Sequence, residues 1–150
     1  MPNTFHFTED SYEQSIISLF KEMGYEYHYG PELEAETGRE LTDATIPGVL
    51  RKAMLVINGT DKAAAVDEAI RQIREQFSLP LVGANITLTD WIQNGLDVTF
   101  KTAQGTLRSD HIKIIETNPD HIDNNSFVVA NQWTVVNGKS TKRADIVVFI

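Results

Sequence analysis

The feature that most constrains the fold is a change in the spacing of apolar residues partway along the chain. Up to about residue 94, apolar residues recur at intervals of three and four, as on one face of a helix. From residue 97 they alternate with polar residues or form short unbroken runs, as in strands. We therefore expect helices mainly in the first part of the chain and strands mainly in the second.

The first predicted helix covers about residues 8–23. Thr8 suits the N-cap, and two acidic residues follow it in the first turn, where the helix dipole favours negative charge. A short strand is expected over 25–29, and the acidic residues 32–40 are predicted to form an exposed loop. The apolar stripe expected to be buried on the first helix consists of Tyr12, Ile16, Leu19, Phe20 and Met23.

Further helices are expected over residues 62–77, with Asp61 as the N-cap, and over about 87–94. Residues 49–57 fit a shorter helix, and the Pro-Gly pair before them argues against a longer one. Two of the histidines, His111 and His121, are expected on the surface, and both tryptophans, Trp91 and Trp133, in packed positions. The predicted elements are therefore largely amphipathic, as in an ordinary globular chain.

Four strands are expected in the second part of the chain. Residues 97–101 and 107–115 predict a β-hairpin, and residues 127–136 a further strand that ends at a strong Asn-Gly turn signal. The unbroken apolar run Ile146–Ile150 is typical of a strand buried on both faces in the middle of a sheet. Because domains usually end in exposed polar residues, we expect residues 1–150 to be the N-terminal part of a single domain whose sheet continues beyond residue 150.

Composition and motifs exclude several classes of protein. The 150 residues contain no cysteine, which excludes disulfides, thiol catalysis and cysteine-ligated zinc. No apolar run approaches the ~18 residues of a membrane span, and residues 1–4 lack the pattern of a signal peptide, so we expect no membrane partner and a cytoplasmic protein. Motifs for nucleotide binding, serine hydrolysis and zinc hydrolysis (a P-loop, GxGxxG, GxSxG and HExxH) do not occur in the sequence.

The charge is uneven along the chain. Residues 1–40 hold 9 acidic and 2 basic residues, whereas residues 41–150 hold 12 acidic and 11 basic residues, which together give the net charge of −8. Nucleic-acid binding normally requires a basic face, because phosphate contacts supply most of the affinity. We therefore expect the chain alone to bind DNA poorly, so that any role on DNA depends on other domains or on metal ions that screen the acidic side.

Asp145 is the acidic residue best placed for chemistry. It stands between a basic stretch and the apolar run Ile146–Ile150, so a rigid strand would hold its carboxylate at the edge of a sheet. Carboxylates in such positions bind Mg²⁺ in metal-dependent phosphodiester hydrolysis. The alternative explanation is an aspartate that pairs with Arg143 or Lys142, or that accepts backbone N–H bonds at the start of the strand.

Two acidic residues of the first helix are candidate partners for Asp145. At about 100° per residue, Glu9 and Glu13 both border the apolar stripe rather than pointing straight into water. Compensation of the helix dipole explains Glu9, whereas Glu13 lies past the first turn and lacks that explanation. The alternative for Glu13 is a boundary residue whose carboxylate reaches solvent.

A small basic cluster, Lys139, Lys142 and Arg143, lies beside Asp145 in the sequence. Contact with DNA phosphates is one interpretation of this cluster, and a solvated loop is the other.

Several stretches of the sequence together are similar to one known family. They are Thr8–Glu13, Gly24–Glu26, Asn94–Val98, Ile112–Ile115, Asn125–Val136 and Arg143–Ile150. These stretches resemble the N-terminal nuclease region of the restriction (R) subunit of type I restriction–modification enzymes. The resemblance spans most of the chain, is specific at both ends and is loose over about residues 30–80.

The resemblance implies a restriction-endonuclease-like core of the PD-(D/E)xK type, an α/β fold with a mixed sheet flanked by helices, present here in incomplete form. The aspartate in the family's Arg-x-Asp-Ile-Val pattern matches Asp145, and Ala144 stands where the motif has proline. The acidic residue of the family's opening helix best matches Glu13, with Glu9 as the second choice. Both matched carboxylates are expected to bind Mg²⁺, and the family's Glu-X-Lys strand is expected beyond Ile150.

The resemblance also implies a function. It implies metal-dependent cleavage of double-stranded DNA, coupled to translocation by ATP-binding motor domains downstream, with methylation and specificity subunits as partners. The 150 residues alone are then expected to be inactive. The alternative is a non-catalytic module that docks the R subunit onto its partners through residues 32–40 and keeps a degenerate nuclease fold. A stand-alone nuclease of different architecture is a third possibility.

Overall fold

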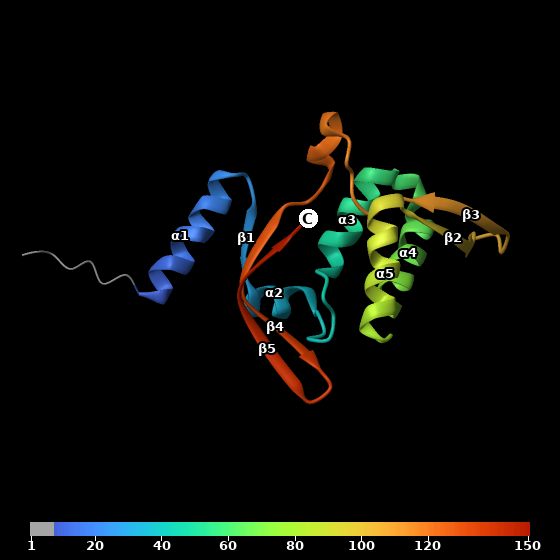
Figure 1. The fold of residues 1–150 in the computed structure, drawn as a ribbon. Helices are drawn as coiled ribbons and strands as arrows, with labels where there is room; N and C mark the ends of the chain where they lie inside the picture. The colour runs from blue at the N-terminus through green and yellow to red at the C-terminus, as the bar shows by residue number, and fades with distance from the viewer. Residues whose placement is uncertain (1–7) are drawn as a thin grey trace, which may run out of the picture. The chain divides into compact units, whose positions relative to one another are not determined.

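The computed structural model describes residues 8–150, and its chain forms two compact units (Figure 1). The first unit combines the chain up to Leu41 with Phe127–Ile150, and the second is Thr42–Ser126. The stretch used above to argue against a signal peptide, residues 1–4, lies outside the described residues. No helix within residues 8–150 is long and apolar enough to cross a membrane.

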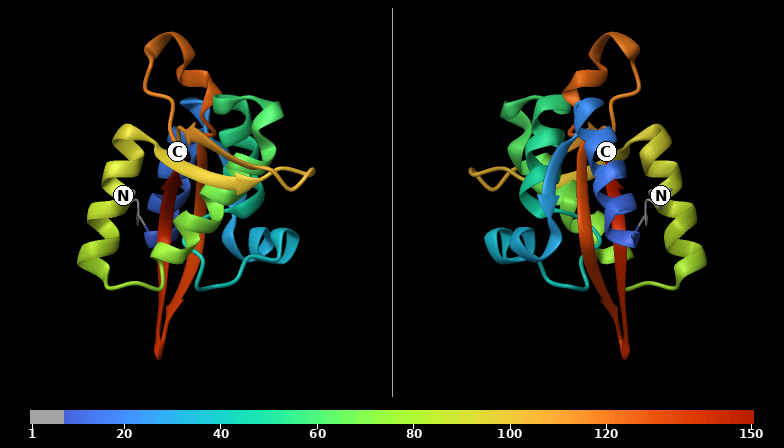
Figure 2. Two further views of the ribbon diagram at one scale, coloured as in Figure 1. Left: turned by 90° about the vertical axis from the view of Figure 1, so that its right-hand side faces the viewer. Right: turned by 90° about the vertical axis from the view of Figure 1, so that its left-hand side faces the viewer.

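The first unit is built on a three-stranded mixed sheet with helices packed against it. The central strand, β4, pairs in parallel with β1 and antiparallel with β5. Both views of Figure 2 show β4 and β5 as one long hairpin. The sheet and its helices confirm the expected mixed α/β fold. The elements are α1 (Glu9–Glu22), β1 (Glu26–Tyr29), α2 (Gly30–Thr37), β4 (Val128–Asn137) and β5 (Ser140–Phe149).

Most of the predicted strand 146–150 lies in β5, which begins earlier, at Ser140, and within residues 8–150 this strand is at the edge of the sheet. Within the described residues, β5 has one neighbouring strand, and Val148 is 37% exposed. The buried central strand is β4, where Val129 and Ala130 are fully buried. An apolar run reports how hydrophobic a strand is, but it does not report how many strands pair with it. The second neighbour of β4 is β1, about a hundred residues earlier in the chain.

Helix α1 starts where the sequence predicts. The side chain of Thr8 accepts a hydrogen bond from the backbone N–H of Ser11, and the backbone N–H of Thr8 donates to Ser11 Oγ, which forms a reciprocal cap. The predicted buried stripe, however, is wrong, because Tyr12 and Leu19 are 60% and 56% exposed. The buried residue of the helix is Ile17, the neighbour of the predicted Ile16. The helix is therefore rotated about its axis relative to the prediction, and Glu13 faces the sheet.

The exposed loop predicted over residues 32–40 is also wrong. Residues 30–37 form helix α2, which begins with a proline in its first turn, where the missing N–H has no cost. Leu33 is only 3% exposed, so the helix buries an apolar residue although the surrounding stretch is acidic. Arg39 follows the helix and is buried, with its guanidinium 3.6 Å from the centre of the Trp133 ring. It also donates two hydrogen bonds of 3.1 Å to the carbonyl oxygen of Thr134.

The second unit packs helices against an antiparallel hairpin. The hairpin predicted from alternation is confirmed, although its second strand ends at Ile112. Its buried core joins α3 and α4 to the hairpin through Met54, Val66, Ile73, Val98 and Ile112, among others. Its elements are α3 (Pro47–Asn58), the 3₁₀ turn η1 (Thr60–Lys62), α4 (Ala63–Gln76), α5 (Leu81–Asn94), β2 (Leu96–Lys101), β3 (Leu107–Ile112) and the 3₁₀ turn η2 (Pro119–Asn124).

Three helix boundaries in this unit differ from the prediction. Pro47 opens α3 rather than preventing it, since proline is favoured in a first turn. Asp61 lies within the 3₁₀ turn before α4, and the residue at the N-cap, Lys62, makes no capping hydrogen bond with its side chain. Helix α5 begins at Leu81, earlier than predicted, although Gly83 and Asn85 are weak helix formers. In this added part of the helix, Ala84 is only 5% exposed.

Gly30 is required where β1 passes into α2. A Cβ atom at this position would lie 2.5 Å from the carbonyl oxygen of Asn131 and 2.9 Å from that of Gln132, both backbone atoms that side-chain rotation cannot move. We expect Gly30→Ala to lower the free energy of unfolding by about 1–3 kcal/mol, as overpacking does. Gly48→Ala is the matched control, because its Cβ would meet open space. Urea unfolding followed by circular dichroism measures both, and equal stabilities would contradict the proposed close approach.

Candidate active site

The candidate site is centred on the carboxylate of Glu13, which α1 presents to the central strand. Glu13 Oε1 accepts a hydrogen bond of 2.6 Å from Asn131 Nδ2, and Oε2 accepts one of 3.0 Å from Gln132 Nε2. Glu13 is partly buried, and Asn131 is 4% exposed. A carboxylate offers about four lone-pair positions, so these two bonds leave others available to a further ligand.

Tyr27 on β1 orients the first of these amides. Its hydroxyl donates a hydrogen bond of 3.0 Å to Asn131 Oδ1, which leaves the amide nitrogen to donate to Glu13. The ammonium of Lys21, from α1, lies 4.5 Å from the centre of the Tyr27 ring. Burial raises the pKa of the Tyr27 hydroxyl above its usual value of 10.0, and the negative charge of Glu13 raises this pKa further.

The backbone of β4 is unusual at Gln132, whose φ is 53°. In a regular strand, successive side chains point to opposite faces of the sheet. Here the side chains of Asn131 and Gln132 both reach Glu13, and the left-handed backbone at Gln132 accompanies this departure. Such a conformation costs a residue with a side chain on the order of 1–3 kcal/mol, so surrounding contacts must hold it in place.

Asp145 occupies the position on β5 that corresponds to Gln132. The register pairs Asn131 with Ile146 and Trp133 with Ala144, so Gln132 and Asp145 are the residues between these two pairs. Asp145 is exposed. Within residues 8–150 it forms no ion pair with Arg143 or Lys142, the pairing considered above as an alternative.

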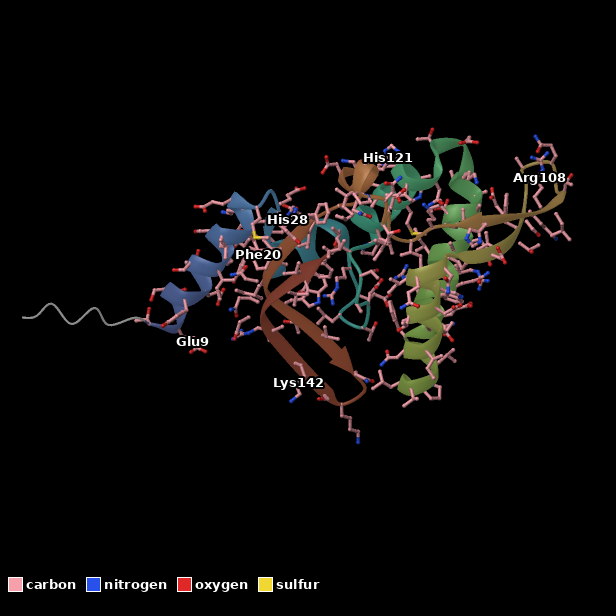
Figure 3. All side chains as sticks on the ribbon, turned by 45° about the horizontal axis from the view of Figure 1, so that its top comes forward. Glu9, Phe20, His28, Arg108, His121 and Lys142 are labelled. Carbon is pink, nitrogen blue, oxygen red and sulfur yellow. The ribbon has the colours of Figure 1, made fainter. Side chains whose placement is uncertain are left out.

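The structure separates the two acidic candidates on the first helix. Glu9 is the exposed first residue of α1, at the end of the helix labelled in Figure 3. Glu13, one turn later, is the carboxylate bound by β4. The three basic candidates, Lys139, Lys142 and Arg143, are exposed on the β4–β5 hairpin, with Lys139 in its turn. Figure 3 shows Lys142 on this hairpin.

Within residues 8–150, no three histidine, aspartate or glutamate side chains form a group that could hold a metal ion by themselves. The donor chemistry nonetheless suits Mg²⁺, which prefers carboxylate oxygens and commonly uses only one or two carboxylates from the protein. Glu13 supplies a carboxylate with unused lone pairs, and Asp145 supplies an exposed one. Both are oxygen donors of the kind that Mg²⁺ prefers.

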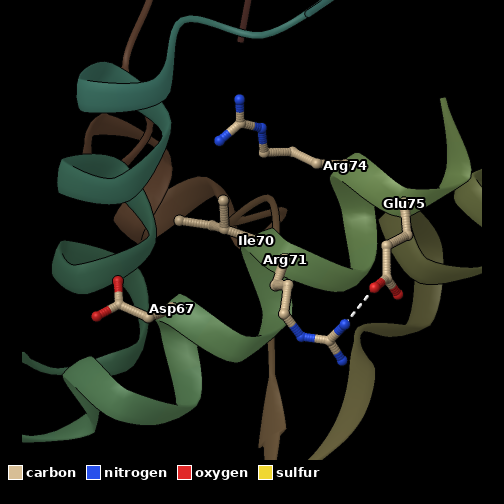
Figure 4. A pocket seen from close by; sticks show the side chains of 5 residues that line it. All are labelled: Asp67, Ile70, Arg71, Arg74 and Glu75. Carbon is tan, nitrogen blue, oxygen red and sulfur yellow. Dashed lines mark hydrogen bonds and ion pairs between the residues drawn. The ribbon is translucent and has the colours of Figure 1, made fainter. Parts of the chain in front are cut away.

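A second group of charged side chains, on α4 of the second unit, forms ion pairs. A surface hollow of about 420 Å³ along α4 is lined by side chains that include Asp67, Arg71 and Glu75 (Figure 4). Arg71 pairs with Glu75 and with Glu68, and its hydrogen bond lowers the pKa of Glu68 to about 2. Asp67 pairs with Arg51, and Arg74 pairs with Asp43. Because each charged side chain of the hollow has an ion-pair partner, the hollow has the features of a helix surface rather than of a binding site.

Two histidines and both tryptophans lie where the sequence predicts. His111 is on the surface beside Asp97, at 2.7 Å, and His121 is exposed. Trp133 is 2% exposed, and Trp91 packs against the core of the second unit.

Sequence reasoning missed Asn131, Gln132 and Tyr27. One signal was available, because two amides stand next to each other in the otherwise largely apolar stretch 127–136. Buried amides need hydrogen-bond partners, so such a pair marks a place where another element must supply a polar group.

The family is shown by comparison with known proteins. Residues 6–150 match the family model of the type I restriction enzyme R protein N-terminus. The chain therefore belongs to this family of R-protein N-terminal regions. It is 26% identical over 147 residues to the type I restriction enzyme HindI endonuclease subunit of Haemophilus influenzae. That alignment covers 95% of this chain but 14% of the relative's length. No solved structure matches the chain.

The effect of the Glu13 charge on the pKa of the Tyr27 hydroxyl can be tested by titration. Glu13→Gln removes a negative charge that disfavours the phenolate, so the pKa of Tyr27 should fall toward 10.0 while remaining raised by burial. NMR of chains labelled at the tyrosine ring carbons measures this pKa, and Tyr27→Phe assigns the resonance. Glu9→Gln is the control and should leave the pKa unchanged. An unchanged value in Glu13→Gln would contradict the arrangement.

Proposed function

We propose that residues 1–150 are the N-terminal part of a Mg²⁺-dependent DNA endonuclease domain of the PD-(D/E)xK type, within a longer R subunit. The observation that carries the proposal is the Glu13 carboxylate, which is bound by the amides of Asn131 and Gln132 on β4. Asp145 lies on the neighbouring strand β5, between the residues paired with Asn131 and Trp133. The family membership supports the proposal, because the relative named above is an endonuclease subunit.

In this proposal each candidate residue has one role. Asp145 and Glu13 bind the metal ion through carboxylate oxygens. Bound Mg²⁺ lowers the pKa of the attacking water and neutralises charge that develops on the phosphate. Lys139, Lys142 and Arg143, exposed on the β4–β5 hairpin, contact the DNA phosphates. These contacts offset the acidic charge of residues 1–40.

The proposal extends beyond the described residues. We place the family's Glu-X-Lys pair on a strand after residue 150, where its glutamate completes the metal site and its lysine orients the water. The ATP-binding motor domains that translocate DNA lie further downstream, and methylation and specificity subunits complete the assembly. Recognition of the DNA sequence is delegated to those partners. The protein acts in the cytoplasm, where its DNA substrate is found.

A non-catalytic docking module is the second candidate, and one observation favours it. Several large apolar residues of α1 are exposed, an arrangement often found where a partner binds. They are Tyr12, Ile16, Leu19 and Met23. In this case changes on the acidic surface of residues 32–40 should disrupt assembly with the partner subunits, while Asp145 should be dispensable for cleavage.

Replacement of Asp145 separates the two candidates. In the full-length R protein assembled with its partner subunits, Asp145→Ala should reduce DNA cleavage by more than ~100-fold, because a metal ligand is lost. ATP hydrolysis should be preserved. Asp123→Ala, which removes an exposed carboxylate in η2, should cleave normally. Normal cleavage by Asp145→Ala would overturn the nuclease assignment and favour the docking module.

The isolated chain gives a second test. Because the proposed glutamate and lysine lie beyond residue 150, residues 1–150 should show no Mg²⁺-dependent DNA cleavage. A gel assay on supercoiled plasmid measures this. Robust Mg²⁺-dependent cutting that disappears in Asp145→Ala would show that the chain already holds a complete catalytic site.

A further inference from the structure

We propose that Asn131 and Gln132 are positioning residues that hold the Glu13 carboxylate in its metal-binding orientation. This inference rests on the function proposed above. It assigns a role to two amides that neither the sequence motifs nor the family match singles out. Their role is to fix where the free lone pairs of Glu13 point, while the metal ion itself is bound by carboxylates.

The hydrogen bonds form a directed chain. The Tyr27 hydroxyl donates to Asn131 Oδ1, and Asn131 Nδ2 donates in turn to Glu13 Oε1. Gln132 Nε2 donates to the other carboxylate oxygen. A carboxylate bound at both oxygens cannot rotate about its last bond without breaking a hydrogen bond. Its orientation is therefore fixed before any metal ion binds, which is the arrangement that metal sites require of their outer partners.

The backbone supports this interpretation. A strand in regular geometry would direct Asn131 and Gln132 to opposite faces, and only one amide would reach α1. The φ of 53° at Gln132 breaks the alternation at this one position, in a conformation that L side chains rarely adopt. Gly30 leaves room for the carbonyl oxygens of both residues, since a Cβ there would clash with them. In this left-handed backbone, which glycine adopts with less strain, the Gln132 side chain donates its hydrogen bond to Glu13.

The position of the unusual backbone also connects the two proposed metal ligands. Gln132 and Asp145 are the residues that lie between the paired positions Asn131–Ile146 and Trp133–Ala144 of β4 and β5. Gln132 therefore donates a hydrogen bond to Glu13 and lies at the strand position that corresponds to Asp145. A change in the side chain of Gln132 should alter metal binding without removing either ligand.

The experiment compares Gln132→Gly with Gln132→Ala in the full-length R protein assembled with its partner subunits. Both variants remove the amide donor, but only glycine relieves the left-handed backbone. The Mg²⁺ concentration for half-maximal DNA cleavage should rise roughly 10-fold or more in both, as is typical when an outer partner of a metal ligand is lost. Thermal unfolding should show the glycine variant to be at least as stable as the alanine variant.

Two further variants complete the design. Asn131→Ala should raise the Mg²⁺ requirement in the same way. Gln14→Ala removes an exposed amide next to Glu13 in the sequence and should have no effect. ATP hydrolysis, measured in every variant, should be unchanged. A merely structural role predicts a different pattern, in which the melting temperature falls and the Mg²⁺ requirement stays as in the original protein.

The outcomes distinguish this inference from the proposed function. If Asp145→Ala is inactive while Gln132→Gly, Gln132→Ala and Asn131→Ala all require the original Mg²⁺ concentration, the positioning role is overturned and the nuclease assignment stands. If Asp145→Ala cleaves normally, both are overturned. An increased Mg²⁺ requirement in all three amide variants, together with inactive Asp145→Ala, supports both.

Discussion

The first unit depends on a polar contact at the centre of its sheet, the hydrogen bonds from Asn131 and Gln132 to Glu13. These bonds set the rotation of α1, because they require the helix to present Glu13, and with it Ile17, to the sheet. The same rotation leaves Tyr12, Leu19 and Met23 largely exposed. Leaving a buried amide unsatisfied costs about 1–3 kcal/mol, so pairing two amides can compete with burial of an additional apolar side chain.

The sequence predicted most elements of the fold, because periodicity and caps are local signals. The Thr8 cap, the β2–β3 hairpin and the turn after β4 follow from a few neighbouring residues each, whereas residues 140–145 were not expected in a strand. The errors share a cause that is not local. The buried face of α1, the docking of α2 and the central place of β4 all depend on pairing with residues about a hundred positions away.

In the candidate site, too, some residues could be predicted from the sequence and others could not. Asp145 and Glu13 stood out because carboxylates beside apolar segments are visible in a sequence and match a family motif. The amides and Tyr27 did not, since their importance lies in what they bind rather than in their own chemistry. The left-handed backbone at Gln132 is similarly invisible, because glutamine carries no preference for that conformation.

The first unit is formed by two stretches of chain that are separated by the second unit, and this has a consequence for synthesis on the ribosome. Strand β1 leaves the ribosome early, but its partner β4 follows only after the whole of Thr42–Ser126. At ordinary elongation rates this delay is on the order of ten seconds, during which α1 has no sheet to pack on. The second unit, whose residues are contiguous, can fold within that interval. Rare codons between residues 42 and 126 would lengthen the exposure of the nascent α1 and so raise its dependence on chaperones.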